Sequence, residues 1–226
     1  LFRSHLSQYI DRTVTKRSVM TIPYNATNDS SATYIADALW KSHKVKIDRK
    51  VAYKLSEILR AALTSIAPGP LAVMDWIKLE MGKAIDRGCP TIDWVTPSGF
   101  QVKQKRNNYS TKRLDCKLLG GCQFRIIDAE IGPSKAKHQS SGSPNLIHSI
   151  DSSLLHLTFQ RFNAPFTVIH DSVLCRATDM QTLSTLVRET YMNIFAEQDF
   201  LTDFAQQIGA ETEPPIIDTL RPEDRK

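Results

Sequence analysis

Residues 166–175 read Phe-Thr-Val-Ile-His-Asp-Ser-Val-Leu-Cys, and this stretch predicts a β-hairpin. The two apolar runs, 166–169 and 173–175, each have the β-branched or apolar composition of a buried strand. The polar triplet between them is too short for anything except a tight turn, which puts Asp171 at the tip. A carboxylate beside a histidine is costly there unless water, a metal ion or a phosphate environment receives it. An ordinary Asx turn is the competing interpretation, and the triplet alone favours it.

The composition is that of a globular protein with an excess of positive charge. The chain has 226 residues, of which 41% are hydrophobic and 23% charged, enough for one large domain or two small ones. Its formal net charge of +5 weakly favours a polyanionic partner. No apolar run reaches membrane-spanning length, so we expect no membrane partner. The cysteines show no metal-binding spacing, and we expect reduced thiols in an intracellular protein: Cys89, Cys116, Cys122 and Cys175.

The first segment, 3–24, has the pattern of a helix with a functional stripe. Residues at successive i,i+4 positions lie on one slowly drifting face, and here they are Arg12, Lys16, Met20 and Tyr24. At 1.5 Å per residue, two cations and an aromatic ring along about 18 Å of helix can contact an extended triphosphate and a base. The competing interpretation is a solvated basic face with a half-buried tyrosine.

Three further helices are predicted before the pattern changes, at about 29–44, 48–66 and 71–85, with a break at 68–70. Between the first two lies a segment, 41–54, that holds six cations. Either it follows a nucleic-acid backbone or it is a solvated helix junction.

After residue 90 the apolar residues alternate, which predicts short strands at 92–95 and 100–102 and a long hairpin at 109–131 that turns at Gly120-Gly121. A two-stranded ribbon can enter a DNA major groove and read base edges, although an ordinary hairpin with a hydrophilic face is the alternative. The polar side of this hairpin carries Arg113, Asp115, Lys117, Gln123 and Arg125.

The last part of the chain combines a polar loop with helices. We expect a loop at 134–143, a helix from Pro144 to about Phe162 with His148 and Asp151 at i,i+3, and two helices after the 166–175 hairpin. These two are predicted from Met180 to Ala196, capped by Asp179, and from Asp199 to Ile208.

Two of these stretches carry a family resemblance. The pattern R-x3-K-x7-Y over Arg12–Tyr24 resembles the motif B helix of single-subunit, bacteriophage-type RNA polymerases, and Ile169–Ser172 resembles their motif C. Ser172 favours RNA polymerases over family A DNA polymerases, which usually carry an acidic residue there. Further stretches at 94–100, 121–125 and 143–149 resemble the phage enzymes in the same order.

The resemblance implies an α+β fold, part of the right-hand polymerase architecture. Residues 1–147 would form a fingers portion that includes a promoter specificity hairpin at 109–131. Residues 148–209 would form the C-terminal palm portion with the motif C hairpin, and 210–226 a flexible tail. The resemblance also implies partners: template and promoter DNA, nucleoside triphosphates, nascent RNA and an upstream polymerase fragment. It implies the cytoplasm of an infected bacterium, with the mitochondrion as the alternative.

The same resemblance implies roles for individual residues. Asp171 would ligate catalytic Mg²⁺ with His170 beside it, and His148 would contact the sugar region near the growing end. Arg12 and Lys16 would bind the incoming triphosphate, and Tyr24 would guard its base and ribose. The residues that would read or hold promoter DNA are Arg113, Lys117, Gln123 and Arg125.

Templated transfer of a nucleotide from a nucleoside triphosphate to an RNA 3′ end by two Mg²⁺ ions needs at least two facing carboxylates. This chain lacks the upstream strand that carries the motif A aspartate in the family, so we expect it to be inactive alone. A fragment of a family A DNA polymerase and a non-catalytic nucleic-acid-binding module are the alternatives.

Overall fold

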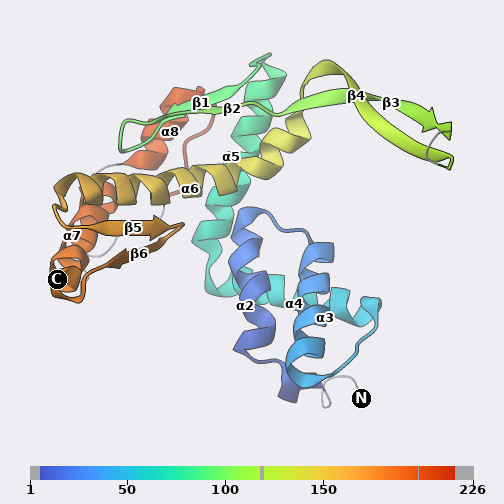
Figure 1. Cartoon of the computed structure of the whole chain (residues 1–226), viewed down its shortest axis with the longest axis horizontal. Helices are drawn as coiled ribbons and strands as arrows, with labels where there is room; N and C mark the ends of the chain where they lie inside the picture. Colours follow the sequence, from blue (N-terminus) through green and yellow to red (C-terminus); the bar gives the residue numbers. More distant parts are fainter. Residues whose placement is uncertain (1–5, 118–119, 198, 217–226) are drawn as a thin grey trace. The chain divides into compact units, whose positions relative to one another are not determined.

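The computed structural model describes residues 6–117, 120–197 and 199–216. The chain divides into two units, Leu1–Ile77 (unit 1) and Lys78–Lys226 (unit 2). Figure 1 shows the helices and the three two-stranded antiparallel sheets that the described residues form. This mixture confirms the α+β expectation at the level of secondary structure.

Unit 1 is helical, and short polar side chains begin its helices. The carboxylate of Asp11 accepts a hydrogen bond from Val14 N–H (2.9 Å), Thr27 caps the next helix and Asp48 the one after. The elements are the 3₁₀ turn η1 (Ser7–Tyr9), α2 (Arg12–Thr21), the 3₁₀ turn η2 (Ile22–Tyr24), α3 (Asn28–His43), α4 (Arg49–Ile66) and the start of α5 (Pro68–Asp86).

The prediction of one continuous helix over 3–24 is wrong for the part that the structure describes. Asp11 has extended backbone angles and caps a new helix, so α2 starts at Arg12. Pro23 lies in the 3₁₀ turn that follows α2, and Asn25 then ends the segment with φ +67°. The predicted end of the helix before Pro68 is confirmed, since α4 ends at Ile66, but α5 begins at Pro68 rather than at residue 71. Both prolines lie in the first turn of α5, where a missing N–H costs little.

Two apolar clusters hold unit 1 together. Val14, Ile35 and Leu39 are fully or almost fully buried and join α2 to α3. A second cluster places Ile22 against Leu71 and Met74. Since α2 buries Val14 and Ser18, its polar stripe lies on the exposed side.

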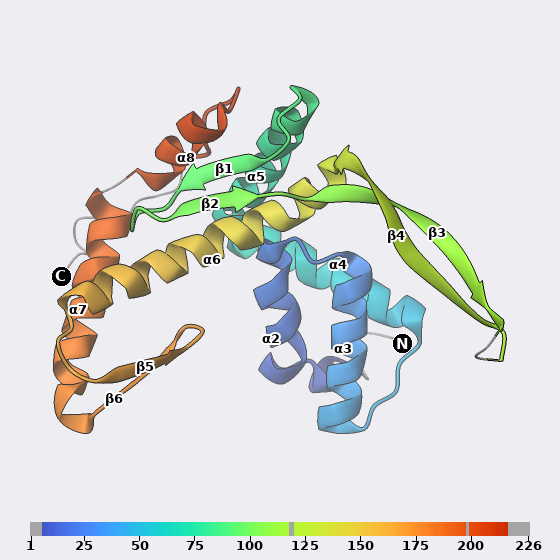
Figure 2. The ribbon, with the colours of Figure 1, turned by 45° about the horizontal axis from the view of Figure 1, so that its top comes forward.

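Unit 2 contains all the described strands. Strand β1 (Ile92–Val95) pairs with β2 (Gln101–Gln104), β3 (Asn107–Cys116) with β4 (Cys122–Pro133), and β5 (Phe166–Ile169) with β6 (Ser172–Cys175). Figure 2 shows the β3–β4 ribbon extending beyond β1 and β2. The other elements of unit 2 after α5 are α6 (Lys135–Arg161), the 3₁₀ turn η4 (Ala177–Asp179), α7 (Met180–Met192), the π-helical turn η5 (Asn193–Glu197) and α8 (Phe200–Ile208).

Helix α6 overturns the predicted loop at 134–143. It starts at Lys135 and contains Pro144, which was expected to begin the helix. Its first turns bury His138, Gly142 and Ser143, so they carry no apolar stripe to signal a helix. The first turns of α6 are instead held by hydrogen bonds of His138 and by close packing against Gly82.

A smaller difference concerns α7. Its α-helical geometry ends at Met192 rather than at Ala196, and π-helical geometry continues from there. Asp179 makes no capping hydrogen bond, since its carboxylate accepts from Arg176 at 2.7 Å.

The ring of His138 is fully buried where β2, β3 and α6 meet. The backbone N–H of Arg106 donates to its Nε2 at 3.2 Å, and its Nδ1 lies 3.1 Å from the side-chain amide of Gln104. Because Nε2 accepts a hydrogen bond, protonating it would break that bond. Burial first, and then the charge of Arg106, lower the pKa of His138 below 6.5. This neutral ring ties the base of the ribbon to α6.

A buried carboxylate holds the end of the described chain. Glu80 on α5 is fully buried and accepts from Lys83 Nζ (2.9 Å), the Glu211 N–H (2.8 Å) and Thr212 Oγ1 (2.7 Å). Glu211 in turn pairs with Arg87 at 2.8 Å. Burial alone would raise the pKa of Glu80, but the hydrogen bonds from these partners outweigh it and lower the pKa. Residues 211 and 212 are thereby fastened to α5, while 217–226 of the expected tail lie outside the described residues.

We expect the free energy of unfolding to fall at acidic pH through His138. Unfolding restores the ordinary pKa of 6.5, so the unfolded chain binds a proton that the folded ring refuses. The contribution of His138 to the free energy of unfolding is complete above pH 6.5. Below that pH it falls by up to about 1.4 kcal/mol per pH unit. Urea unfolding followed by circular dichroism at a series of pH values measures it. His138→Gln should flatten this dependence, whereas the exposed His156→Gln should keep it. An unchanged dependence in His138→Gln would contradict the assignment.

Candidate functional site

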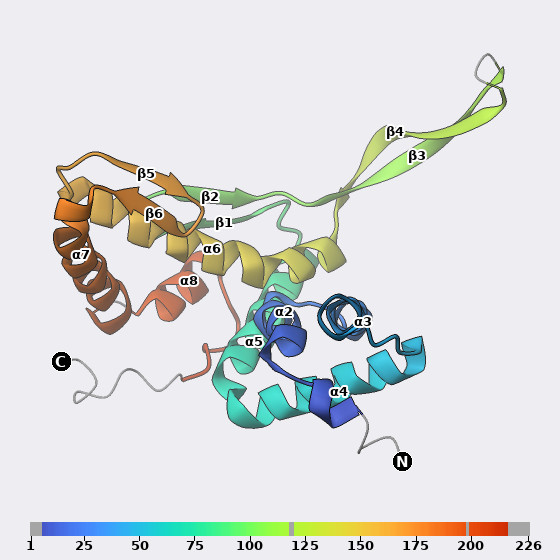
Figure 3. The same ribbon diagram turned by 60° about the horizontal axis from the view of Figure 1, so that its bottom comes forward.

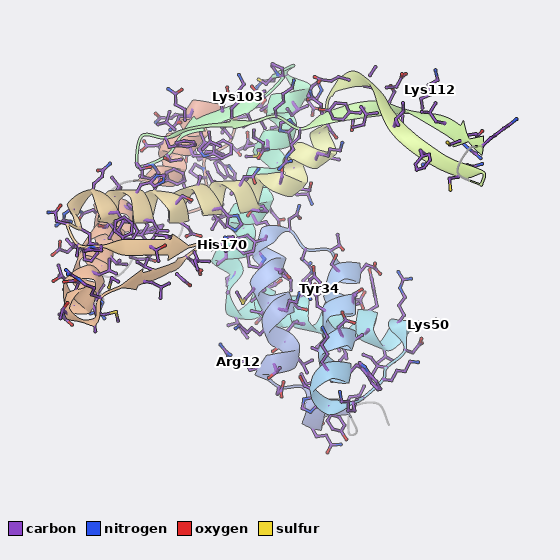
Figure 4. All side chains as sticks on the ribbon, viewed as in Figure 1. Arg12, Tyr34, Lys50, Lys103, Lys112 and His170 are labelled. Carbon is purple, nitrogen blue, oxygen red and sulfur yellow. The ribbon has the colours of Figure 1, made fainter. Side chains whose placement is uncertain are left out.

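The β5–β6 hairpin has the tight turn that the sequence predicts, with Asp171 in it, but the turn has two residues because Ser172 belongs to β6. Ile169 and Ser172 are the last paired residues of the ladder, so His170 and Asp171 form the turn. His170 has φ +55°, the left-handed conformation that two-residue hairpin turns require. Figure 4 labels His170 at this tip. The turn exposes Asp171.

The two strands are not buried, which contradicts the prediction. All of β5 is exposed, including Ile169 at 62%, and Leu174 on β6 is 58% exposed. The base of the hairpin is fixed by aromatic contacts, because Phe166 stacks on Phe159 of α6 with ring centroids 3.8 Å apart. The β-branched composition therefore predicted the two strands correctly but predicted their burial wrongly. The described residues do not pack over the exposed side chains of the hairpin.

Helix α6 runs alongside the hairpin (Figure 3). Its Asp151 carboxylate interacts electrostatically with that of Asp171. Burial raises the pKa of Asp151, the Asp171 carboxylate raises it further, and His148 lowers it. The three side chains are thus within electrostatic reach of one another. The sequence signal for Asp151 was its i,i+3 spacing from His148, but that spacing did not show that it lies near Asp171.

Arg12, Lys16 and Met20 share the exposed side of α2, as predicted. Tyr24 is half-buried and lies in the 3₁₀ turn η2, so it does not continue the α-helical stripe. Elsewhere on α2, the Arg17 guanidinium lies 3.8 Å from the centre of the Tyr34 ring. These candidates belong to unit 1, whereas His148, His170 and Asp171 belong to unit 2.

The β3–β4 ribbon has two chemically different faces. Directly paired residues point to the same face, and the pairs alternate along the ladder. Arg113 with Arg125 and Asp115 with Gln123 form a polar face. The opposite face is formed by Lys112 with Ile126, Leu114 with Phe124 and Cys116 with Cys122.

The polar face carries unbalanced positive charge. Arg113 and Arg125 are direct partners, and like charges placed opposite each other destabilise a ribbon unless an anion offsets them. Asp115 contacts Arg113 at 3.5 Å, and among the described residues no carboxylate pairs with Arg125. Neither Asp115 nor Asp128 therefore forms an ion pair with Arg125. Lys117 follows the end of β3 and is exposed.

Within the described ranges no three side chains of His, Cys, Asp or Glu gather as a metal site. None of the described helices combines the length and the apolar character needed to span a membrane.

Comparison with known proteins identifies the family. The family model described as DNA-dependent RNA polymerase matches residues 2–222. This chain belongs to that family. The polymerase chain is 28% identical over 255 residues to the T7 RNA polymerase of Escherichia phage T7, covering 95% of the chain and 27% of the relative.

Two further relatives show the breadth of the family. The DNA-directed RNA polymerase of Pseudomonas phage phiKMV is 26% identical over 214 residues, covering 91% of this polymerase chain and 26% of the relative. The human mitochondrial DNA-directed RNA polymerase is 27% identical over 204 residues, covering 85% of the chain and 16% of the relative. The chain spans about a quarter of the length of the phage relatives it matches.

We expect Asp171→Asn to lower the pKa of Asp151, because the substitution removes a negative charge that now raises it. Carboxyl NMR titration of the two proteins measures the change. Asp93→Asn, at an exposed position of strand β1, is the matched control and should leave the pKa of Asp151 unchanged. Equal titration of Asp151 in the Asp171→Asn and unsubstituted proteins would show that the two carboxylates do not interact.

Proposed function

We propose that this chain is the C-terminal fingers and palm portion of a phage-type DNA-directed RNA polymerase, which transfers nucleotides from nucleoside triphosphates to an RNA 3′ end. The observation that carries the proposal is Asp171 in the turn of a hairpin closed by Ile169 and Ser172, inside a family match over 2–222. The fingers would comprise 1–147, the palm 148–209 and the tail 210–226. The family A DNA polymerase alternative is disfavoured by Ser172 and by the relatives.

Asp171 is the proposed ligand of catalytic Mg²⁺. The described residues fit such an ion in part: Asp171 is exposed, and its charge raises the pKa of Asp151, a repulsion that a dication would relieve. When bound, Mg²⁺ stabilises the attacking and leaving oxygens of the transfer. The facing carboxylate of motif A would come from the polymerase outside this chain, and so would the cover of the exposed β5 and β6.

The triphosphate would be bound by the exposed side of α2. Arg12 offers a planar fork of donors to phosphate oxygens, and Lys16 offers a point charge to the departing pyrophosphate. Tyr24, in the turn that follows, would contact the base and ribose. His170 beside Asp171 and His148 on α6 would contact the nucleotide near the growing end.

The polar face of the ribbon is the proposed promoter reader. Arginine suits paired contacts with guanine, and glutamine with adenine, in the major groove, so Arg113, Arg125 and Gln123 would read bases. Lys117 would contact phosphate and position the ribbon. Template and promoter DNA, nascent RNA and an upstream polymerase part are the partners. We propose an infected bacterium as the location, with the mitochondrion as the alternative.

In a full-length polymerase that carries this chain, Asp171→Asn should lower the rate of nucleotide addition at least about a thousandfold and leave promoter binding nearly intact. The reason is that the substitution removes a metal ligand worth several kcal/mol in the transition state. Single-turnover extension and promoter binding are measured side by side. Asp93→Asn is the control, with normal extension expected. Near-normal extension by Asp171→Asn with Mg²⁺ would refute the metal assignment.

The ribbon makes a separate prediction. Arg125→Ala should cost about 1–3 kcal/mol at one promoter position and relax specificity there, whereas Lys117→Ala should weaken binding to all sequences alike. Lys112→Ala is the matched control, because Lys112 is a cation on the opposite face of the same strand pair. Binding to a panel of single-base promoter variants at fixed salt decides. If Arg125→Ala weakens every variant equally, the residue does not read a base.

A further inference from the structure

The net charge of the chain is concentrated in one short segment of unit 1. Residues 41–54, the basic segment, contain one acidic residue, Asp48, and therefore carry a formal charge of +5, equal to that of the whole chain. Everything outside the segment is thus neutral on balance. Its six cations are Lys41, Lys44, Lys46, Arg49, Lys50 and Lys54.

The structure exposes all six cations at the junction of α3 and α4. Arg49 pairs with Asp29 (2.7 Å) and Lys54 with Glu57 (2.9 Å), while Asp48 is occupied by the backbone N–H of Arg49 as a helix cap. The four cations that form no ion pair with any described carboxylate are Lys41, Lys44, Lys46 and Lys50. A cluster of unneutralised lysines repels itself unless an anion lies against it.

This cluster is separate from the proposed triphosphate site. Figure 4 shows Lys50 and Arg12 on opposite sides of unit 1. The basic segment therefore does not extend the α2 stripe, and a ligand bound there would lie apart from the proposed triphosphate site.

We propose that the basic segment binds the phosphodiester backbone of nucleic acid without reading its sequence. Lysine is a compact point charge that suits phosphate, and the segment contains one arginine, already paired with Asp29. Trp40 is exposed, but Lys44 Nζ lies over its ring, 5.7 Å from the centre. This lysine occupies one of the two ring faces on which a base could stack. The ligand is thus an extended polyanion that binds through electrostatic attraction. The site does not include the residues proposed for catalysis or for promoter reading.

Salt dependence of binding tests the proposal. Each lysine that neutralises a phosphate adds about 0.9 to the slope of log affinity against log salt concentration on duplex DNA, and about 0.7 on single strands. The triple variant Lys41→Gln, Lys46→Gln, Lys50→Gln should therefore lower the slope by about 2 to 3 and weaken binding at least about tenfold. Fluorescence anisotropy with a promoter-free DNA duplex, and separately with a single-stranded RNA, measures the slope.

A matched triple variant controls for total charge. Lys78→Gln, Lys103→Gln and Arg188→Gln remove the same charge from exposed positions in unit 2 and should leave the slope nearly unchanged. Replacing Lys41, Lys46 and Lys50 by arginine should preserve the slope, since the charges remain. Circular dichroism confirms that each variant is folded.

The proposal is overturned if the glutamine variant keeps the full slope with both probes, or if the control triple loses as much. A loss with either probe supports it, and the probe affected identifies duplex or single strand as the ligand. The assay contains no nucleotide, promoter or metal ion, so its failure is distinguishable from failure of the proposed catalytic function.

Discussion

The buried ring of His138 lies on α6, the helix that contacts both hairpins proposed for function in unit 2. It accepts a hydrogen bond from the backbone of Arg106, where β3 begins, and it belongs to α6, which begins where β4 ends. Helix α6 then continues to Phe159, whose ring stacks on Phe166 at the base of the β5–β6 hairpin. One rigid helix therefore carries the ribbon at one end and the hairpin of Asp171 at the other. A neutral, fully buried imidazole suits this position because its hydrogen bonds leave no charge to solvate.

Both hairpins place like charges close together. Arg113 opposes Arg125 on the ribbon, and Asp171 raises the pKa of Asp151 beside the second hairpin. Such arrangements weaken a free chain by Coulomb repulsion, and a ligand of opposite charge removes the cost. On the ribbon, phosphate groups or base acceptors would offset the repulsion between the two arginines. At the Asp171 turn, a divalent cation would offset the repulsion between the two carboxylates. The basic segment follows the same principle with lysines alone.

The sequence predicted those elements whose signal is local. The helix starts near Asp48 and Asp199 and the tight turn that contains His170 and Asp171 were predicted correctly, since a helix start or a tight turn depends on a few neighbouring residues. It failed where distant groups supply the stabilisation. The first turns of α6 are held by His138 and by close packing near Gly82 rather than by an apolar stripe. Asp11 interrupts the expected first helix through one side-chain hydrogen bond that competes with helix continuation.

The sequence by itself determined the family, the hairpin that exposes Asp171, and the alternation that puts Arg113 and Arg125 on one face, because each follows from residue identity and a fixed backbone period. Only the tertiary structure decided that Asp151 lies within electrostatic reach of Asp171, that β5 is exposed, and that β6 alternates between exposed and half-buried residues. The distance between the two carboxylates and the exposure of the strands both depend on how α6 and the hairpin pack against each other. A strand pattern records the tendency of a side chain to be covered, but the covering partner is set by the packing of the rest of the molecule.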